Sequence, residues 1–272
     1  MKPLFKSIIP AISISTALIV TAGAFSFFDD APLDAEATNA AVTTLTTKIL
    51  ENSQFAHRRL DDELAGKFLD HYLDSLDGSH MIFLKNDLEE FDKYRPKLAK
   101  LTSIDGDTKL AHIIFKRYLE RLNERSAFIK ELLEKDQFDF STDENFSYDR
   151  EKAPNPATLD EAKSIWKKHL KYEYLQEKLS GKKEPEIKKF LNRRYDRFTE
   201  MMRKLSENDV MGMYLDSLAQ VYDPHSDYFD PAQHKSFTSD MNLSLIGIGA
   251  TLQSKEDYCT IVSLVSRRSS RA

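Results

Sequence analysis

FKRYLERLNERSAFIKELL, residues 115–133, carries the clearest structural signal in the sequence. Its apolar and small side chains follow one another at alternating intervals of four and three residues: Phe115, Leu119, Leu122, Ser126, Ile129 and Leu133. This spacing places them on one face of an α-helix about two heptads long. Such a stripe could form a cofactor or partner surface, but the core seam of a helix bundle is the favoured interpretation.

The helical pattern extends over most of the chain, from Thr38 to about Tyr222. An apolar face recurs at Leu60, Leu64, Phe68, Tyr72 and Leu76, and another at Phe190, Leu191, Tyr195, Phe198, Met202 and Leu205. A last helix should bury Val210, Tyr214, Leu218 and Val221. Trp166, Tyr172 and Tyr174 are interpreted as packing residues. These patterns predict a mainly α fold.

The expected helix ends follow from local capping signals. Capping boxes are predicted at Asn86 with Glu89, Thr158 with Glu161, and Ser206 with Asp209. Pro185 fits a first helical turn, Pro96 should kink or end a helix, and Asp77-Gly78-Ser79 should stop one. Residues 141–156, which hold turn formers and two prolines, are expected to form a long loop.

The character of the sequence changes after residue 222. Prolines, aspartates and aromatic residues mix without a period, and then LSLIGIGATLQ (243–253) and YCTIVSLV (258–265) predict two short strands. We therefore expect a helical domain over residues 25–225, a connector over 226–244 and an incomplete β-containing domain over 245–266.

Composition narrows the class of protein. Among 272 residues there are only eight glycines, which favours helices, and the net charge is −5. Without the first 24 residues, 37 basic and 44 acidic side chains leave −7, a poor charge balance for nucleic-acid binding. The single cysteine, Cys259, excludes an intramolecular disulfide and a cysteine-based zinc site, and its apolar neighbours predict a buried side chain.

The first 24 residues have the pattern of a secretory signal peptide. Lys2 and Lys6 precede an apolar run of 17 residues that closes with Ala22-Gly23-Ala24, an A-x-A cleavage pattern. We expect cleavage before Phe25, no stable membrane span afterwards, and a periplasmic protein. The alternative is an uncleaved anchor in the inner membrane that holds the protein on the periplasmic face.

The segment VYDPHSDYFDPAQHKSF, residues 221–237, contains the side-chain types of a serine-hydrolase triad in Asp223, His225 and Ser226. In an extended chain His225 and Ser226 point to opposite faces, so the three cannot assemble as a triad. A turn fixed by side-chain hydrogen bonds is favoured, and no catalytic residue is assigned. Asp227, Asp230 and His234 add ligand types without a metal-site order, so no metal or cofactor is expected.

The glycine motif Gly247-Ile248-Gly249 precedes a predicted strand. Backbone amides around such a turn can converge on the terminal carboxylate of a peptide, whose last residues would pair with the strand. The simpler alternative is an ordinary strand start.

Taken together, these features resemble the tail-specific (C-terminal-processing) serine proteases. The similarity is carried by Asp223-Pro224-His225-Ser226, Tyr228, Phe237 and Gly247-Ile248-Gly249. The resemblance implies an N-terminal helical domain and then a PDZ domain whose carboxylate-binding loop is Leu245, Ile246, Gly247 and Ile248. It also implies that Asp223, Pro224, His225, Ser226 and Tyr228 form a structural motif, while a serine–lysine dyad in a later domain cleaves substrates.

The sequence departs from that family near its end. From Leu245 only 28 residues remain, fewer than a PDZ domain needs, and the dyad is not among them. Residues 267–272 look aberrant, so we expect a frameshifted or otherwise truncated reading frame and no activity from this chain alone. The implied partners of intact relatives are C-terminal tails of unfolded or exported proteins, and a protein adaptor could dock on the helical domain.

Two hypotheses therefore stand. The chain is the N-terminal part of a tail-specific serine endopeptidase that degrades exported proteins with apolar C-termini. Alternatively, it is a stand-alone periplasmic helical binding or scaffold protein without enzymatic activity.

Overall fold

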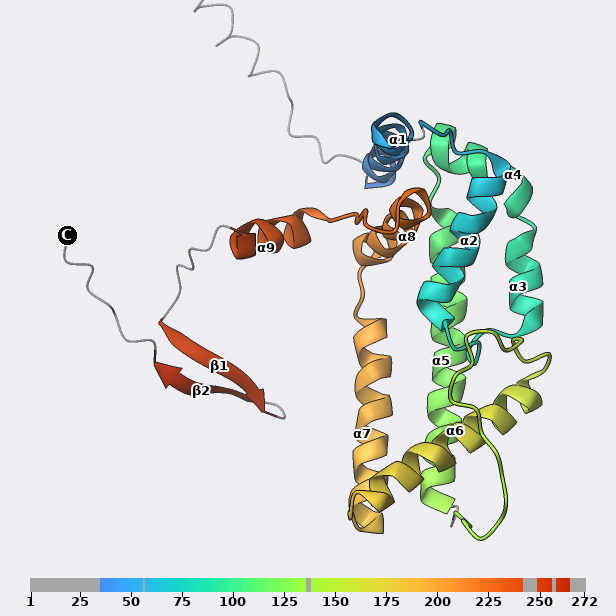
Figure 1. The fold of residues 1–272 in the computed structure, drawn as a ribbon, viewed down its shortest axis with the longest axis vertical. Coiled ribbons are helices and arrows are strands. Elements are labelled where there is room, and N and C mark those ends of the chain that lie inside the picture. Colours follow the sequence, from blue (N-terminus) through green and yellow to red (C-terminus); the bar gives the residue numbers. More distant parts are fainter. Residues whose placement is uncertain (1–34, 56, 136–137, 242–248, 256–257, 265–272) are drawn as a thin grey trace, which may run out of the picture.

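A computed structural model describes residues 35–55, 57–135, 138–241, 249–255 and 258–264. These residues form mainly helices, followed by one antiparallel hairpin (Figure 1). The helices are α1 (Ala35–Ser53), α2 (Asp62–Asp77), α3 (Lys85–Asp92), α4 (Arg95–Lys100), a π-helical turn η1 (Leu101–Asp105), α5 (Lys109–Lys135), α6 (Leu159–Leu179), α7 (Glu184–Arg203), α8 (Glu207–Tyr222) and α9 (Pro231–Met241). Strands β1 (Ala250–Lys255) and β2 (Tyr258–Leu264) pair with each other. The predicted mainly α fold with a few strands is confirmed.

The long helix α5 is the common support of the helical domain. One half packs with α3 and α8 and is reached by Tyr72 of α2, and the other half packs with α6 and α7 (Figure 1). The predicted stripe is buried at Phe115, Leu122, Ile129 and Leu133, with Leu119 partly buried. One apolar face on a single long helix therefore joins two cores at opposite ends of the domain.

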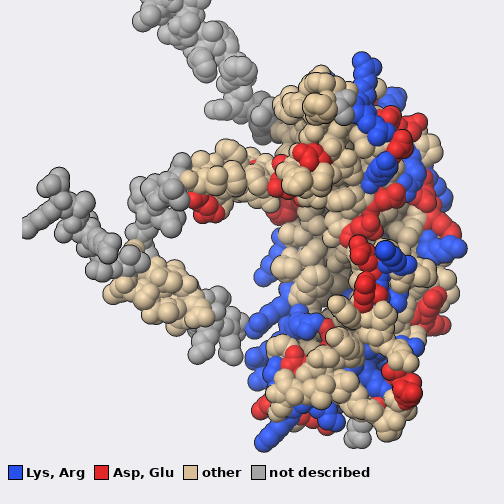
Figure 2. All heavy atoms as spheres, viewed as in Figure 1, with Lys and Arg blue, Asp and Glu red and all other residues tan. Residues whose placement is uncertain are grey.

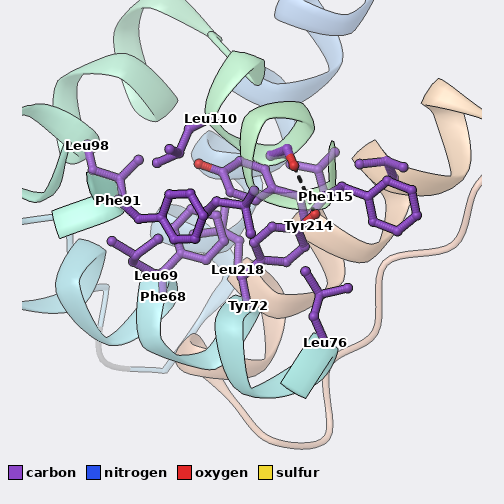
Figure 3. Packing of buried hydrophobic residues seen from close by; sticks show 14 of the residues in the cluster. Phe68, Leu69, Tyr72, Leu76, Phe91, Leu98, Leu110, Phe115, Tyr214 and Leu218 are labelled. Carbon is purple, nitrogen blue, oxygen red and sulfur yellow. Dashed lines mark hydrogen bonds between the residues drawn. The ribbon is translucent and has the colours of Figure 1, made fainter. Parts of the chain in front are cut away.

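The larger core lies between α2, α5 and α8. Phe68 and Tyr72 of α2 meet Tyr214 of α8, with ring centroids 4.5 and 5.1 Å apart (Figure 3). The Tyr72 hydroxyl donates a hydrogen bond to the Ala111 carbonyl at 3.2 Å, so a buried polar group is satisfied. All five members of the predicted stripe between Leu60 and Leu76 are buried here.

Most predicted helix ends are confirmed. The side chains of Thr158 and Ser206 accept hydrogen bonds from the amides three residues ahead, and Asp209 completes the second capping box. Pro185 lies in a first turn, and α2 ends before Gly78, as predicted. Pro96 neither kinks nor ends α3, which already stops at Asp92, and instead lies in the first turn of α4.

The prediction of a capping box at Asn86 and Glu89 is wrong. Helix α3 already begins at Lys85, and the carboxylate of Asp87, not that of Glu89, accepts the hydrogen bond from the Leu84 amide at 2.9 Å. The reason is tertiary: two arginines of α5 hold Asp87 in a buried position.

Two predictions of burial were also wrong. Phe190 and Phe198 of α7 are each 41% exposed, because the buried face is carried by Ile187, Leu191 and Met202 instead. Cys259 is exposed, since the hairpin places no other described element over β2.

Helix α9 was not expected from the sequence. It buries no residue, and its start is held by Asp230, whose carboxylate accepts hydrogen bonds from the amides of Ala232 and Gln233 at 2.7 and 2.8 Å. An aspartate that caps a helix start explains why a segment without an apolar period is helical. Across the described part of the chain, no helix combines the length and the apolar character needed to cross a membrane.

Candidate functional site

The segment with triad-like residues follows directly after α8. Asp223 ends that helix with extended backbone angles, and its carboxylate accepts a hydrogen bond from the His225 amide at 3.1 Å. The Ser226 amide donates to the Asp223 carbonyl at 2.9 Å, which closes a tight turn around Pro224. These bonds lower the pKa of the Asp223 carboxyl, chiefly through the His225 amide and then through the His225 ring.

The geometry of this turn differs from that of a catalytic triad. Nδ1 of His225 lies 3.2 Å from the Asp223 carboxylate, but the hydroxyl of Ser226 interacts with the other carboxylate oxygen at 3.5 Å and with Gln54 at 3.2 Å. The aspartate thus contacts both groups, whereas a triad needs the histidine between serine and aspartate. The His225 side chain is also 89% exposed. The His225 imidazole is thus not directed at the serine, and the carboxylate that the serine contacts is a weak base because its pKa is lowered.

The turn is anchored to the helical domain from two sides. The Tyr228 amide donates to the carboxylate of Asp216, on α8, at 2.9 Å, and burial raises the pKa of that carboxyl. Gln54, just after α1, donates to Ser226 across 172 residues of sequence. Sequence reasoning missed Asp216 and Gln54, because no local pattern links either residue to this turn.

The remaining candidate residues fall into two groups. Asp230, one of the candidate ligand types, caps α9, and the residues that the structure describes contain no group of three or more acidic, histidine or cysteine side chains that could hold a metal. Leu245, Ile246, Gly247 and Ile248 lie outside the described residues. The following Gly249 has a positive φ of 67° directly before β1, a conformation that glycine adopts without strain.

The described residues therefore define a helical domain that ends in a hydrogen-bonded turn without a nucleophile–base pair. Residues 46–232 match the family model described as "Tail specific protease N-terminal domain". The chain belongs to this family. The match runs from α1 through the turn at Asp223–Tyr228 and ends at the start of α9.

A curated relative agrees with this assignment. The chain is 35% identical over 235 residues to a protein named "Tail-specific protease" from Haemophilus influenzae (strain ATCC 51907 / DSM 11121 / KW20 / Rd). The aligned region covers 86% of this chain and 33% of the relative, so the chain spans about one third of the relative's length.

Proposed function

We propose that this chain supplies the helical N-terminal part of a tail-specific serine endopeptidase that degrades exported proteins with apolar C-termini. The observation that carries the proposal is the family match over residues 46–232, which includes nearly all of the helical domain. The helices form a support with three hydrophobic clusters, and in this proposal the chemistry belongs to residues other than those of the turn after α8.

In this proposal the Asp223–Tyr228 turn is a structural connector. Hydrogen bonds to Asp216 and Gln54 set the direction in which the chain leaves α8 towards α9. Ser226 contacts the Gln54 amide and a carboxylate of lowered pKa, a weak base, and no imidazole activates its hydroxyl.

The residues Leu245, Ile246, Gly247 and Ile248 are proposed to form the carboxylate-binding loop of a PDZ domain. Support comes from β1, which begins two residues after Ile248 and pairs with β2 along one edge. Among the described elements, no strand pairs with the other edge of β1, where a peptide could add as a further strand.

We further propose that residues 1–24 direct export to the periplasm and are cleaved off. Mass spectrometry of the protein from its native cells should find Phe25 at the N-terminus. A membrane fraction that retains Met1 would refute cleavage and favour the inner-membrane anchor.

The experiment that tests the assignment is a cleavage assay with the purified 272-residue chain and an unfolded protein that ends in apolar residues. We expect no cleavage, because in the turn the His225 ring contacts Asp223 and is not directed at Ser226. The control is Ser226→Ala, which should behave like the wild type. Cleavage that is lost in this variant would overturn the structural interpretation of the turn, and tight binding of a folded periplasmic protein without any effect of its C-terminus would favour the stand-alone scaffold.

A further inference from the structure

The long loop between α5 and α6 lies against α6 and forms a hollow with it. Residues 138–157 have almost no secondary structure, yet aromatic side chains hold the loop in place. The rings of Phe138 and Phe140 lie 4.9 and 5.9 Å from that of Tyr174, and Phe146 lies 6.0 Å from Tyr172. A loop of this length that is packed along its course is usually functional.

The hollow lies between the two aromatic contacts and has a volume of about 340 Å³. Its apolar walls are Phe140 and Phe146 from the loop and Tyr172 and Leu175 from α6. This volume is at the lower end of the range of roughly 300–1,000 Å³ found for ligand sites. It suits one large side chain and its backbone better than a helix or a continuous strand.

The two lysines that line the hollow differ in their partners. The ammonium of Lys171, only 19% of whose side chain is exposed, donates to Glu144 at 2.6 Å and to Thr142 at 3.2 Å. This contact closes one wall and neutralises both charges. Lys168 also lines the hollow, and among the described residues it makes no ion pair.

The electrostatic field at the hollow is positive. The pKa of Glu144 is lowered first by its hydrogen bond with Lys171 and further by the charges of Lys168 and Lys167. Basic side chains also gather along α7, where Figure 2 shows blue spheres at the lower left edge of the molecule. An occupant that brings a carboxylate beside an apolar group would complement both the walls and Lys168.

We propose that this hollow binds the C-terminal residue of a polypeptide chain, with a large apolar or aromatic side chain between Phe140 and Tyr172 and the terminal carboxylate on Lys168. At the end of a chain the terminal carboxylate lies next to the last side chain, so one residue can meet both the apolar walls and Lys168. The rest of the peptide then needs only one way out of the hollow. The inference rests on the proposed function, because such chain ends are its substrates, and it adds a second tail site at a distance in sequence from Leu245–Ile248.

The test uses the full 272-residue chain and a fluorescein-labelled peptide of glycine and serine that ends in Leu-Phe with a free carboxylate. Fluorescence anisotropy should detect binding that weakens about tenfold or more in Lys168→Glu and in Tyr172→Ala, as expected for the loss of a charged hydrogen bond or of a wall. The charge-matched control is Lys116→Glu on the exposed side of α5, which should change the affinity less than about twofold. Circular dichroism checks that each variant is folded. Equal binding of the C-terminally amidated peptide, or equal binding by Lys168→Glu, would overturn the proposal.

Cross-linking separates this inference from the proposed function. A photoreactive group at the penultimate residue of the same peptide should label residues 138–148 or 168–175. Labels confined to residues 245–264 would leave the proposed function standing and refute the second site. If the free-carboxylate peptide binds nowhere on the chain, the second site is refuted, while the proposed function stands, because it requires no tail binding by this chain alone and is tested by the cleavage assay.

Discussion

Asp87 offers a sharp test of how the helical domain is held together. Its side chain is fully buried, and its carboxylate accepts hydrogen bonds from Arg117, from Arg121 at 2.8 and 3.0 Å, and from the Leu84 amide at 2.9 Å. The two arginines lie one turn apart on α5, so one carboxylate fastens α3 to the long helix and also caps the start of α3.

The magnitude of Asp87→Ala follows from these contacts. Removing one partner of a buried ion pair costs about 3–5 kcal/mol of unfolding free energy. Arg117 and Arg121 also pair with carboxylates of α3 and α5 and reach solvent, so we expect the lower end, about 3 kcal/mol. For a folded part of this size, that corresponds to a fall in Tm of roughly 6–12 °C. Asp87→Asn, which keeps an acceptor for the Leu84 amide, should cost about half as much.

The pH dependence of the unfolding free energy shows whether the charge of Asp87 stabilises the folded protein. Burial alone would raise the pKa of Asp87, but hydrogen bonds from Arg121, from the Leu84 amide and from Arg117 outweigh it and lower the pKa. A lowered pKa in the folded state stabilises the protein above the unfolded pKa of about 3.9 and loses this effect as the pH falls through the folded value. The stability difference between the wild type and Asp87→Asn should therefore be full at pH 7 and shrink below about pH 4.

Urea unfolding followed by circular dichroism measures these differences. The matched control is Asp70→Ala, because Asp70 also pairs with an arginine, Arg95 at 2.6 Å, but its side chain is 58% exposed. This control should change the unfolding free energy by less than about 1 kcal/mol. If Asp87→Ala costs no more than Asp70→Ala, or if the difference for Asp87→Asn is the same at pH 3 and pH 7, the reasoning from burial and charge is refuted.

Three further substitutions test the packing by the same urea assay. Gly106→Ala should destabilise by more than about 2 kcal/mol, because φ is +65° and an added Cβ would lie 2.3 Å from the Ala40 carbonyl oxygen; an unchanged midpoint would contradict this contact. Gly212→Ala, within α8 and with no atom within 4 Å of an added Cβ, should instead stabilise by about 0.5–1 kcal/mol, and a loss would show that this space is filled. Trp166→Phe should cost about 1–3 kcal/mol, since the buried Met81 carbonyl loses its 2.6 Å hydrogen bond from the indole, and a neutral effect would mean that another donor replaces it.

Short-range features of the fold could be predicted from the sequence. The apolar period between residues 115 and 133 predicts a helix because side chains three and four residues apart share a face. The caps at Thr158 and Ser206 could be predicted because donor and acceptor lie three residues apart. The loop over 141–156 follows in the same way from its turn formers and prolines.

The errors arise where a distant part of the chain overrides a local preference. Asn86 and Glu89 have the spacing of a capping box, but Asp87 takes the position. Arg117 and Arg121, which follow it by 30 and 34 residues in the sequence, neutralise its carboxylate in the core. Phe190 and Phe198 fit an apolar stripe, but the contacts of α7 with α5 and α6 bury Ile187, Leu191 and Met202 while both phenylalanines stay partly exposed.

In the candidate site, too, the local features could be predicted from the sequence and the long-range contacts could not. That Asp223, His225 and Ser226 form a turn and no triad follows from local hydrogen bonds of the Asp223 carboxylate to groups two and three residues ahead, which short-range sequence reasoning can predict. The anchors of the turn, Asp216 and Gln54, and the hollow between the 138–148 loop and α6 depend on segments that meet only after the helices have packed. A periodic pattern records which face of a helix is apolar but carries no information on which distant residue lies opposite, because that depends on crossing angles and on the shapes of the whole core.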